Sequence, residues 1–279
     1  MGPRFEMLFA EGKNKALTLS YDDGIIHDRK LVQMMNEYGI RGTFNLNSGI
    51  FSFEETVEKN GEETDFSRIA AQEVKTLFEG HEVASHTVTH PSLTELPVGM
   101  IADEVLKDRE ALEGLTKDVI RGFAYPYGTY SKTVEEVLKA CGIEYARTVV
   151  STRGFGIPED FLEWHPTCHH DDAKLMELAK DFCENDGNNA RLFYLWGHSF
   201  ELAQNDNWHV MEGFFQYIAP YKDKIWMATN IEIMDYVKAF QNLKWSIDGN
   251  TVYNPSGIRL WFKKKEQVYC IGANETLEV

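Results

Sequence analysis

Two adjacent carboxylates, Asp22 and Asp23, follow the apolar run 15–21 and precede Gly24. Neighbouring negative charges repel each other, so a tight turn or a bound cation is needed to explain the pair. Asp-Gly is a common turn dipeptide. On these residues alone, a turn and a metal site are equally good interpretations. In a metal site, one carboxylate would bind the cation and its neighbour would accept a proton from water.

The histidines offer further ligands for such a cation. Seven of the nine lie in segments that follow predicted strands or stand beside the two aspartates. His86 and His90 are four residues apart, a spacing that puts two side chains on one face of a helix or a strand. Together with Asp23 they would form a hydrolytic metal site, although two polar loop histidines are the simpler alternative. His198 follows the apolar run 191–197 and suits general acid catalysis, but a lone histidine there is more often structural.

Alternating strands and helices must position these residues. Apolar runs rich in β-formers alternate along the chain with amphipathic runs, which predicts a parallel sheet. Seven or eight such units in roughly 240 residues predict a closed βα barrel, with an open doubly wound sheet as the alternative. In such barrels the chemistry lies at the carboxyl ends of the strands. The predicted strands are 15–21, 40–47, 81–87, 119–128, 143–149, 161–168, 191–199 and 224–230, and the predicted helices are 28–39, 67–80, 98–115, 132–142 and 172–185.

Composition and the last segment limit the possible classes of protein. Residues 245–279 hold turn pairs between short β-type runs, which predicts a small β appendage on a barrel domain of residues 1–244. The formal net charge of −16 argues against nucleic-acid and anionic-membrane partners. We see no leader pattern, no run of about 18 apolar residues and no regular cysteine spacing, so we expect free thiols in a cytoplasmic protein, with a secreted protein shortened at its amino terminus as the alternative.

Taken together and in order, these motifs resemble those of the polysaccharide deacetylase family, carbohydrate esterase family 4, with its chitooligosaccharide deacetylase homology domain. SYDDG at 20–24 looks like the family's first motif, Thr-Phe-Asp-Asp-Gly. HTVTH at 86–90 fits its second motif, His-Ser/Thr-x-x-His. YPYG at 125–128 matches the Pro-Tyr end of the third motif, and LWGHS at 195–199 resembles the last.

The resemblance implies a distorted (β/α)7 barrel and metal-dependent removal of N-acetyl, or alternatively O-acetyl, groups from a carbohydrate. The implied cofactor is a divalent ion, zinc in the first place and cobalt or another divalent ion as alternatives. By position, the resemblance assigns the general base to Asp22, the general acid to His198, the metal ligands to Asp23, His86 and His90, and an oxyanion donor to the backbone N–H of Tyr127.

Two positions depart from the family pattern. Ala124 stands where many members have an arginine that orients the catalytic aspartate, and Arg121 falls on the opposite face of its strand by alternation. The fourth motif is matched only by Trp164 and lacks its aspartate, which supports the acid histidine. Glu232, just after the predicted strand 224–230, is a candidate for that support, and an ordinary carboxylate at a helix start is the alternative.

Some aromatic and imidazole side chains are candidates for substrate binding. Trp164 is a candidate wall for a sugar ring, with His165 and Tyr125 as further pocket residues. A buried aromatic residue with surface histidines is an equally good interpretation of the segment 164–170. Two alternative functions also stay open: hydrolysis of a non-sugar amide or ureide on the same scaffold, and carbohydrate binding without catalysis.

Overall fold

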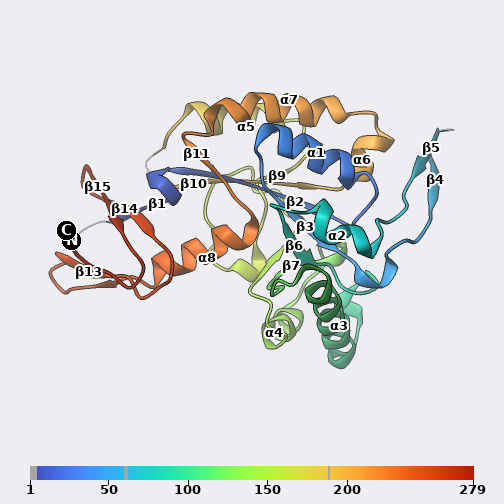
Figure 1. Ribbon diagram of the computed structural model, residues 1–279, viewed down its shortest axis with the longest axis horizontal. Coiled ribbons are helices and arrows are strands. Elements are labelled where there is room, and N and C mark those ends of the chain that lie inside the picture. The colour runs from blue at the N-terminus through green and yellow to red at the C-terminus, as the bar shows by residue number, and fades with distance from the viewer. Residues whose placement is uncertain (1–4, 60–61, 188) are drawn as a thin grey trace.

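A parallel sheet that curls on itself forms the centre of the molecule (Figure 1). The computed structural model describes residues 5–59, 62–187 and 189–279, so the first four residues of the predicted barrel domain lie outside it. The strands follow the order β8, β7, β6, β3, β2, β10, β9, and all neighbours are parallel. Their bounds are β2 Lys15–Asp22, β3 Thr43–Leu46, β6 Glu82–Ser85, β7 Gly122–Ala124, β8 Tyr145–Arg147, β9 Cys168–His169 and β10 Arg191–Gly197.

The ring closes through the segment that leads from Trp164 into β9. The N–H of Trp164 donates to the carbonyl of Ala146 at 3.1 Å, and the N–H of Thr148 donates to the carbonyl of Trp164 at 3.1 Å. On the other side of the segment, the N–H of Thr167 donates to the carbonyl of Tyr194 in β10 at 2.8 Å. The seven-stranded parallel arrangement confirms the predicted distorted (β/α)7 barrel.

The predicted eighth strand exists but does not extend the ring. β11 (Ile225–Met227) pairs with Lys15–Leu17, the amino-terminal part of β2. β3 pairs with Ser20–Asp22, the carboxyl-terminal part of β2. The chain after β11 therefore lies towards the amino ends of the strands.

Helices cover the outside of the barrel, with α5 and α7 along one side and α3 and α4 along another (Figure 1). Helical spacing directs Leu31, Val32 and Met35 of α1 into the core. The predicted helix 67–80 is much shorter, because the N–H of Ile69 donates to the carbonyl of Gly24 and holds the chain extended there. The helices are α1 Asp28–Tyr38, α2 Val74–Leu77, α3 Val98–Thr116, α4 Lys132–Ala140, α5 Leu175–Glu184, α6 Ser199–Gln204, α7 Trp208–Ile218 and α8 Asn230–Gln241.

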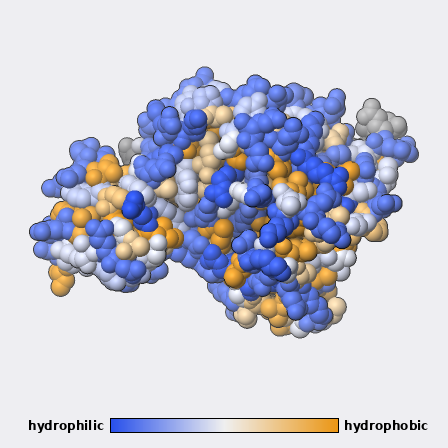
Figure 2. Space-filling view, viewed as in Figure 1, coloured by the Kyte–Doolittle hydropathy of each residue, from blue (hydrophilic) through white to orange (hydrophobic). Residues whose placement is uncertain are grey.

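Two small antiparallel sheets form a lobe beside α8, seen at the left of Figures 1 and 2. The amino-terminal strand β1 joins this lobe by pairing with β14, which the sequence analysis did not predict. A hairpin of β4 (Thr56–Lys59) and β5 (Glu62–Asp65) projects at the opposite end. Within the described ranges, no helix combines the length and apolarity that a membrane span requires. One sheet consists of β1 Phe5–Leu8, β14 Leu260–Lys264 and β15 Gln267–Ile271. The other consists of β12 Lys244–Trp245, β13 Thr251–Tyr253 and β16 Thr276–Glu278.

Gly122 in β7 permits the close approach of Tyr145 in β8. A Cβ at Gly122 would lie 2.2 Å from the Tyr145 hydroxyl, which donates to Glu82 Oε1 at 2.7 Å. We expect Gly122→Ala to lower the free energy of unfolding by about 1–3 kcal/mol, the usual cost of overpacking a core. Urea denaturation followed by circular dichroism measures this change. Gly114→Ala, at a helix position with open space, is the control and should not lower stability. Equal stability of the wild type and Gly122→Ala would contradict the packing argument.

Candidate metal centre and acid–base pair

The carboxyl ends of β2, β6 and β10 bring the five predicted chemical side chains together. Asp22 ends β2, and Asp23 follows in a left-handed conformation with φ 83°. That conformation is held on both sides of the residue, because the Asp23 N–H donates to the carbonyl of Asn45 at 2.9 Å and Arg68 donates to the carbonyl of Asp23 at 2.5 Å. The turn directs the two neighbouring carboxylates to different partners.

Asp23, His86 and His90 converge on one point. Asp23 Oδ1 lies 3.9 Å from His86 Nε2 and 3.8 Å from His90 Nε2. This oxygen is buried and has no hydrogen-bond partner within the described chain, although an Arg68 nitrogen lies 3.3 Å away. His86 Nδ1 lies 2.8 Å from the carbonyl of Ala124, which places the ring proton on Nδ1 and leaves the Nε2 lone pair facing Asp23.

The protonation states of the two imidazoles suit metal binding. Burial lowers the pKa of His86, and burial together with the neighbouring His86 lowers the pKa of His90 to about 4. Both rings are therefore neutral near pH 7, as ligands must be. Two neutral imidazoles and one carboxylate oxygen without a hydrogen-bond partner fit a divalent ion such as zinc.

Side chains of the neighbouring elements fix the loop that carries the two histidines. The Asn47 amide donates to the carbonyls of His86 and Thr87, at 2.5 and 3.1 Å. Asp108 in α3 accepts the Ser85 hydroxyl at 2.6 Å and the His86 N–H at 3.2 Å. These contacts orient the ligands from behind, as outer partners of metal sites generally do.

Asp22 lies inside the barrel and is held by an arginine that the sequence analysis missed. It is 2% exposed, and its carboxylate accepts hydrogen bonds from Asn45 at 2.8 Å and from Arg147. Burial opposes ionisation, but the charge and hydrogen bond of Arg147, with the imidazole of His198 nearby, outweigh it and lower the pKa of Asp22.

Arg147 also resolves the question raised by Ala124. The two residues are paired in the register of β7 and β8, so the guanidinium comes from the strand next to the expected one. An arginine within the predicted strand 143–149 was the available signal in the sequence. Arg121, in contrast, binds Asp235 at the outer, amino-terminal side of the barrel.

His198 lies between two carboxylates. Its Nε2 is 3.8 Å from Asp22 Oδ2, and its Nδ1 is 3.2 Å from Glu201 Oε2. Burial disfavours the imidazolium, but the contacts with Glu201 and Asp22 more than offset this and raise the pKa of His198. Glu201 is thus the supporting carboxylate that the sequence analysis did not find. The sequence offered one signal for this role: Glu201 follows His198 by three residues, at the start of α6. At that position its side chain also accepts the His198 N–H at 3.1 Å.

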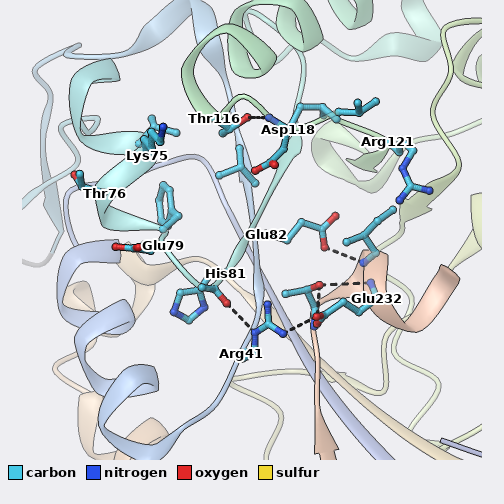
Figure 3. A pocket seen from close by; sticks show the side chains of 18 residues that line it. Arg41, Lys75, Thr76, Glu79, His81, Glu82, Thr116, Asp118, Arg121 and Glu232 are labelled. Carbon is cyan, nitrogen blue, oxygen red and sulfur yellow. Dashed lines mark hydrogen bonds and ion pairs between the residues drawn. The ribbon is translucent and has the colours of Figure 1, made fainter. Parts of the chain in front are cut away.

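The prediction that Glu232 supports His198 is wrong. Glu232 Oε1 lies 2.5 Å from an Arg41 nitrogen, and the other oxygen accepts the N–H of Thr229. These residues border a cavity of about 840 Å³ at the amino ends of β3, β6 and β7 (Figure 3). The reason is the register of β11, which pairs only with Lys15–Leu17 and therefore ends far below the carboxyl end of β2.

Two of the three candidate substrate residues lie in the core. Trp164 and Tyr125 are each 1% exposed. Trp164 packs edge-on against the rings of Tyr145 and Tyr194, and the Tyr125 hydroxyl donates to a backbone carbonyl. Neither side chain offers a face to a sugar, so those two expectations are not met. His165 borders a cavity of about 560 Å³, and its Nδ1 contacts the Thr148 hydroxyl at 2.6 Å.

Tyr127 lies beside the metal ligands. It is the second residue of a 3₁₀ turn, Pro126–Gly128, and its φ is 57°. The first N–H groups of such a turn have no partner within it. The Tyr127 ring is 66% exposed and contacts the His90 ring edge-to-face at 4.5 Å between centroids.

Comparison with known proteins agrees with this geometry. The polysaccharide deacetylase family model matches residues 10–146. The match identifies residues 10–146, about half of the chain, as a polysaccharide deacetylase domain. It is 32% identical over 83 residues to the chitooligosaccharide deacetylase of Bradyrhizobium sp. (strain ANU 289), a match that covers 29% of this chain and 38% of that protein.

Solved structures share the fold at low sequence identity. A candidate polysaccharide deacetylase from Mycobacterium smegmatis has a TM-score of 0.62 at 15% identity, over 86% of this chain and 96% of that one. The esterase family 4 domain of a xylanase from the hindgut metagenome of Trinervitermes trinervoides has a TM-score of 0.51 at 16% identity, over 81% and 92%. A family 4 pseudoenzyme from Bacillus anthracis has a TM-score of 0.51 at 15% identity, over 79% and 65%. Because the shared fold includes a pseudoenzyme, function must be argued from the site.

We expect Arg147→Met to cost about 3–5 kcal/mol of unfolding free energy at neutral pH, because it leaves the buried Asp22 charge unpaired. In the wild type, the pKa of Asp22 is lower in the folded than in the unfolded protein. Its ionised form therefore stabilises the fold at pH values above the unfolded pKa. This contribution is lost as the pH falls through the pKa of the folded protein. Without Arg147, burial would dominate and raise the pKa of Asp22 above its unfolded value. The ionised carboxylate would then destabilise the fold instead of stabilising it. The variant should therefore recover stability relative to the wild type as the pH falls from neutrality towards the unfolded pKa of an aspartate. Urea denaturation of EDTA-treated protein at several pH values measures this.

The control for that experiment is a double-mutant cycle. In an Asp22→Asn background Arg147 is itself the unpaired charge and Arg147→Met removes it, so the substitution should cost far less or even stabilise the protein. The same cost in both backgrounds would show that Arg147 acts through packing, for instance on the Trp196 ring 4.4 Å from its guanidinium, and not through Asp22.

Proposed function

We propose that this protein is a metal-dependent hydrolase that removes acetyl groups from a carbohydrate, with N-acetyl groups as the preferred substrate. One observation carries the proposal. Asp22 Oδ2 lies 3.9 Å from the metal-binding nitrogen of His86 and 3.8 Å from His198 Nε2. A base, an acid and a set of metal ligands thus meet at one place, which is the arrangement that amide hydrolysis requires.

The ligands Asp23, His86 and His90 would hold the ion, which when bound would polarise the acetyl carbonyl and acidify a water molecule. Asp22 is kept ionised by Arg147, so its carboxylate is ready to accept the proton of that water as it attacks. The N–H of Tyr127, in the turn beside His90, would donate to the oxyanion.

His198 supports the preference for N-acetyl groups. An amine is too basic to leave without a proton, whereas the alcohol of an ester needs less assistance. The raised pKa of His198 keeps its imidazole protonated closer to neutral pH, with Glu201 on Nδ1 and Nε2 facing the site. This arrangement suits donation to a departing amine.

Acetate release from chitooligosaccharides tests the proposal, with acetylxylan and small amides measured alongside. We expect Asp22→Asn and His198→Ala each to lower the rate by about 10²–10⁴-fold, the usual contribution of general acid–base catalysis. EDTA should abolish release, and added zinc should restore it. Full activity of both variants would overturn the assigned roles, and faster release from acetylxylan would reverse the proposed preference.

A matched pair of variants tests the corrected position of the supporting carboxylate. Glu201→Gln removes the charge next to His198 and should lower the rate and shift the basic limb of the pH–rate profile to lower pH, because the pKa of His198 falls. Glu232→Gln, at the amino end of the barrel, should leave both unchanged. The opposite result would restore Glu232 as the support of His198.

A further inference from the structure

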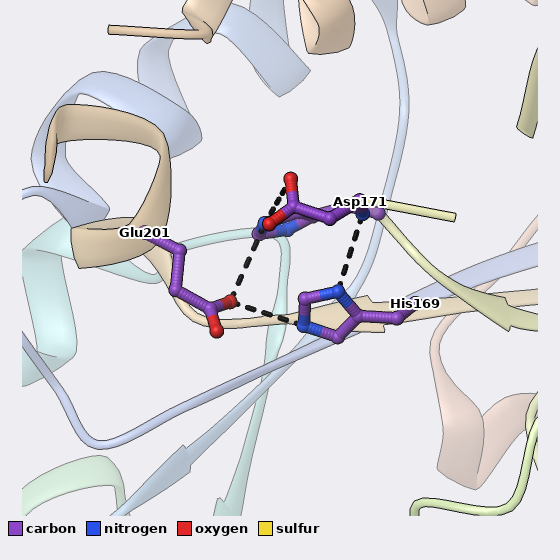
Figure 4. A group of neighbouring side chains, drawn as sticks. His169, Asp171 and Glu201 are labelled. Carbon is purple, nitrogen blue, oxygen red and sulfur yellow. Dashed lines mark hydrogen bonds and ion pairs between the residues drawn. The ribbon is translucent and has the colours of Figure 1, made fainter. Parts of the chain in front are cut away.

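A second group of potential metal ligands lies behind His198. Among the described residues, only one group of three or more potential ligands outside the first centre has its ligand atoms within 4.8 Å of one another, and it consists of His169, His170, Asp171 and Glu201. Three of them follow one another at the end of β9, and the fourth comes from α6. Glu201 points towards His169 and Asp171 (Figure 4).

His170 is the buried member of this group. Its side chain is fully buried, and its Nε2 atom has no hydrogen-bond partner within the described chain. The ring stacks on Tyr21 at 5.7 Å between centroids, and Nδ1 lies 3.2 Å from the Tyr21 hydroxyl. That hydroxyl also lies 3.5 Å from Met211 Sδ, so Tyr21 and Met211 hold the Nδ1 side of the ring and Nε2 points away from them.

The Nε2 atom of His170 faces two carboxylate oxygens. Asp171 Oδ1 and Glu201 Oε2 each lie 3.4 Å from it. A buried ring nitrogen with no hydrogen-bond partner thus lies between two carboxylate oxygens, and a cation placed there would gain three ligands at once.

The fold makes room for the His170 ring. Gly197 ends β10 next to it, and a Cβ at Gly197 would lie 2.1 Å from His170 Nδ1. The His170 N–H also donates to the carbonyl of Trp196 at 2.9 Å. On the outer side, the Asn207 amide donates to Asp171 Oδ1 at 3.0 Å and orients that carboxylate. The ligand atoms are thus positioned by β9, β10, α6 and the residue before α7.

From these contacts we infer that His170, Asp171 and Glu201, with His169 as the fourth ligand, form a second binding site for a divalent transition-metal ion, of the zinc class. Two imidazoles and two carboxylates are a common zinc donor set. His169 Nε2 lies 3.0 Å from Glu201 Oε2, and its Nδ1 accepts the Asp171 N–H at 3.2 Å. Binding through Nε2 therefore moves the His169 proton to Nδ1 and breaks that hydrogen bond.

Metal counting in a variant without the first centre tests the inference, and its outcome does not depend on the proposed deacetylase activity. The His86→Ala/His90→Ala variant is stripped with EDTA, dialysed against zinc alone and analysed by inductively coupled plasma mass spectrometry. We expect one equivalent of zinc to remain bound, and His170→Gln in this background to reduce it to the level of the buffer. His209→Gln, which removes an exposed imidazole of α7, is the control and should retain the full equivalent.

A second measurement does not require the double variant to fold. In the otherwise intact chain, Asp171→Asn changes a side chain that is 38% exposed, and it should weaken the binding of one of two zinc ions by about tenfold or more in calorimetric titration. Retention of zinc after His170→Gln, or a wild type that binds only one ion unaffected by Asp171→Asn, would overturn the second site. The group would then be a network of hydrogen bonds around His198.

Discussion

The ion pair between Asp22 and Arg147 is the interaction on which the site depends. Both side chains are almost completely buried, and transfer of an isolated carboxylate into such a place costs several kcal/mol. Arg147 offsets that cost from across the barrel, and Asn45 adds a neutral donor. The pair therefore fixes the ionisation state of Asp22 and joins β8 to β2 through the barrel interior. A barrel with an apolar interior would provide neither.

Beyond this pair, carboxylates alternate with groups that carry a positive charge or can donate a proton. Arg147 is followed by Asp22, then by His198, and then by Glu201. Each group is held by the next, so the acid and the base are stabilised in the protonation states in which they would act. Asp23 lies outside this series because its left-handed backbone turns its carboxylate towards His86 and His90. The adjacent aspartates can therefore differ in role despite being neighbours in sequence.

The sequence was sufficient to predict that Asp22, Asp23, His86, His90 and His198 lie close together. Asp22 and Asp23 end a strand, His86 and His90 share one loop, and His198 ends another strand, so the alternation of strands and helices brings them to one edge. Arg147 could not be placed in the same way. Its contact with Asp22 depends on the register between β7 and β8 and on its reach across the barrel, and neither follows from local pattern.

The wrong predictions have similar causes. Glu232 follows a strand-like run, but the level at which β11 pairs with β2 decides which end of the barrel it reaches. Trp164 lies in a segment that was predicted as one full strand, 161–168. The observed strand is only Cys168–His169, preceded by a 3₁₀ turn and a single bridge to Arg147, and this short closure directs Trp164 into the core against Tyr145.

The same short closure explains why imidazoles collect behind the acid histidine. Because β9 ends at His169, the chain turns immediately after the sheet and places His169, His170 and Asp171 at the level of His198. α6 begins on the adjacent strand and brings Glu201 into the space between them. One carboxylate oxygen thus lies within 3.4 Å of nitrogen atoms from three imidazoles. The short β9 and the start of α6 together therefore determine where Glu201 lies. Any group bound beside His170 must share the Oε2 atom of Glu201 with His198.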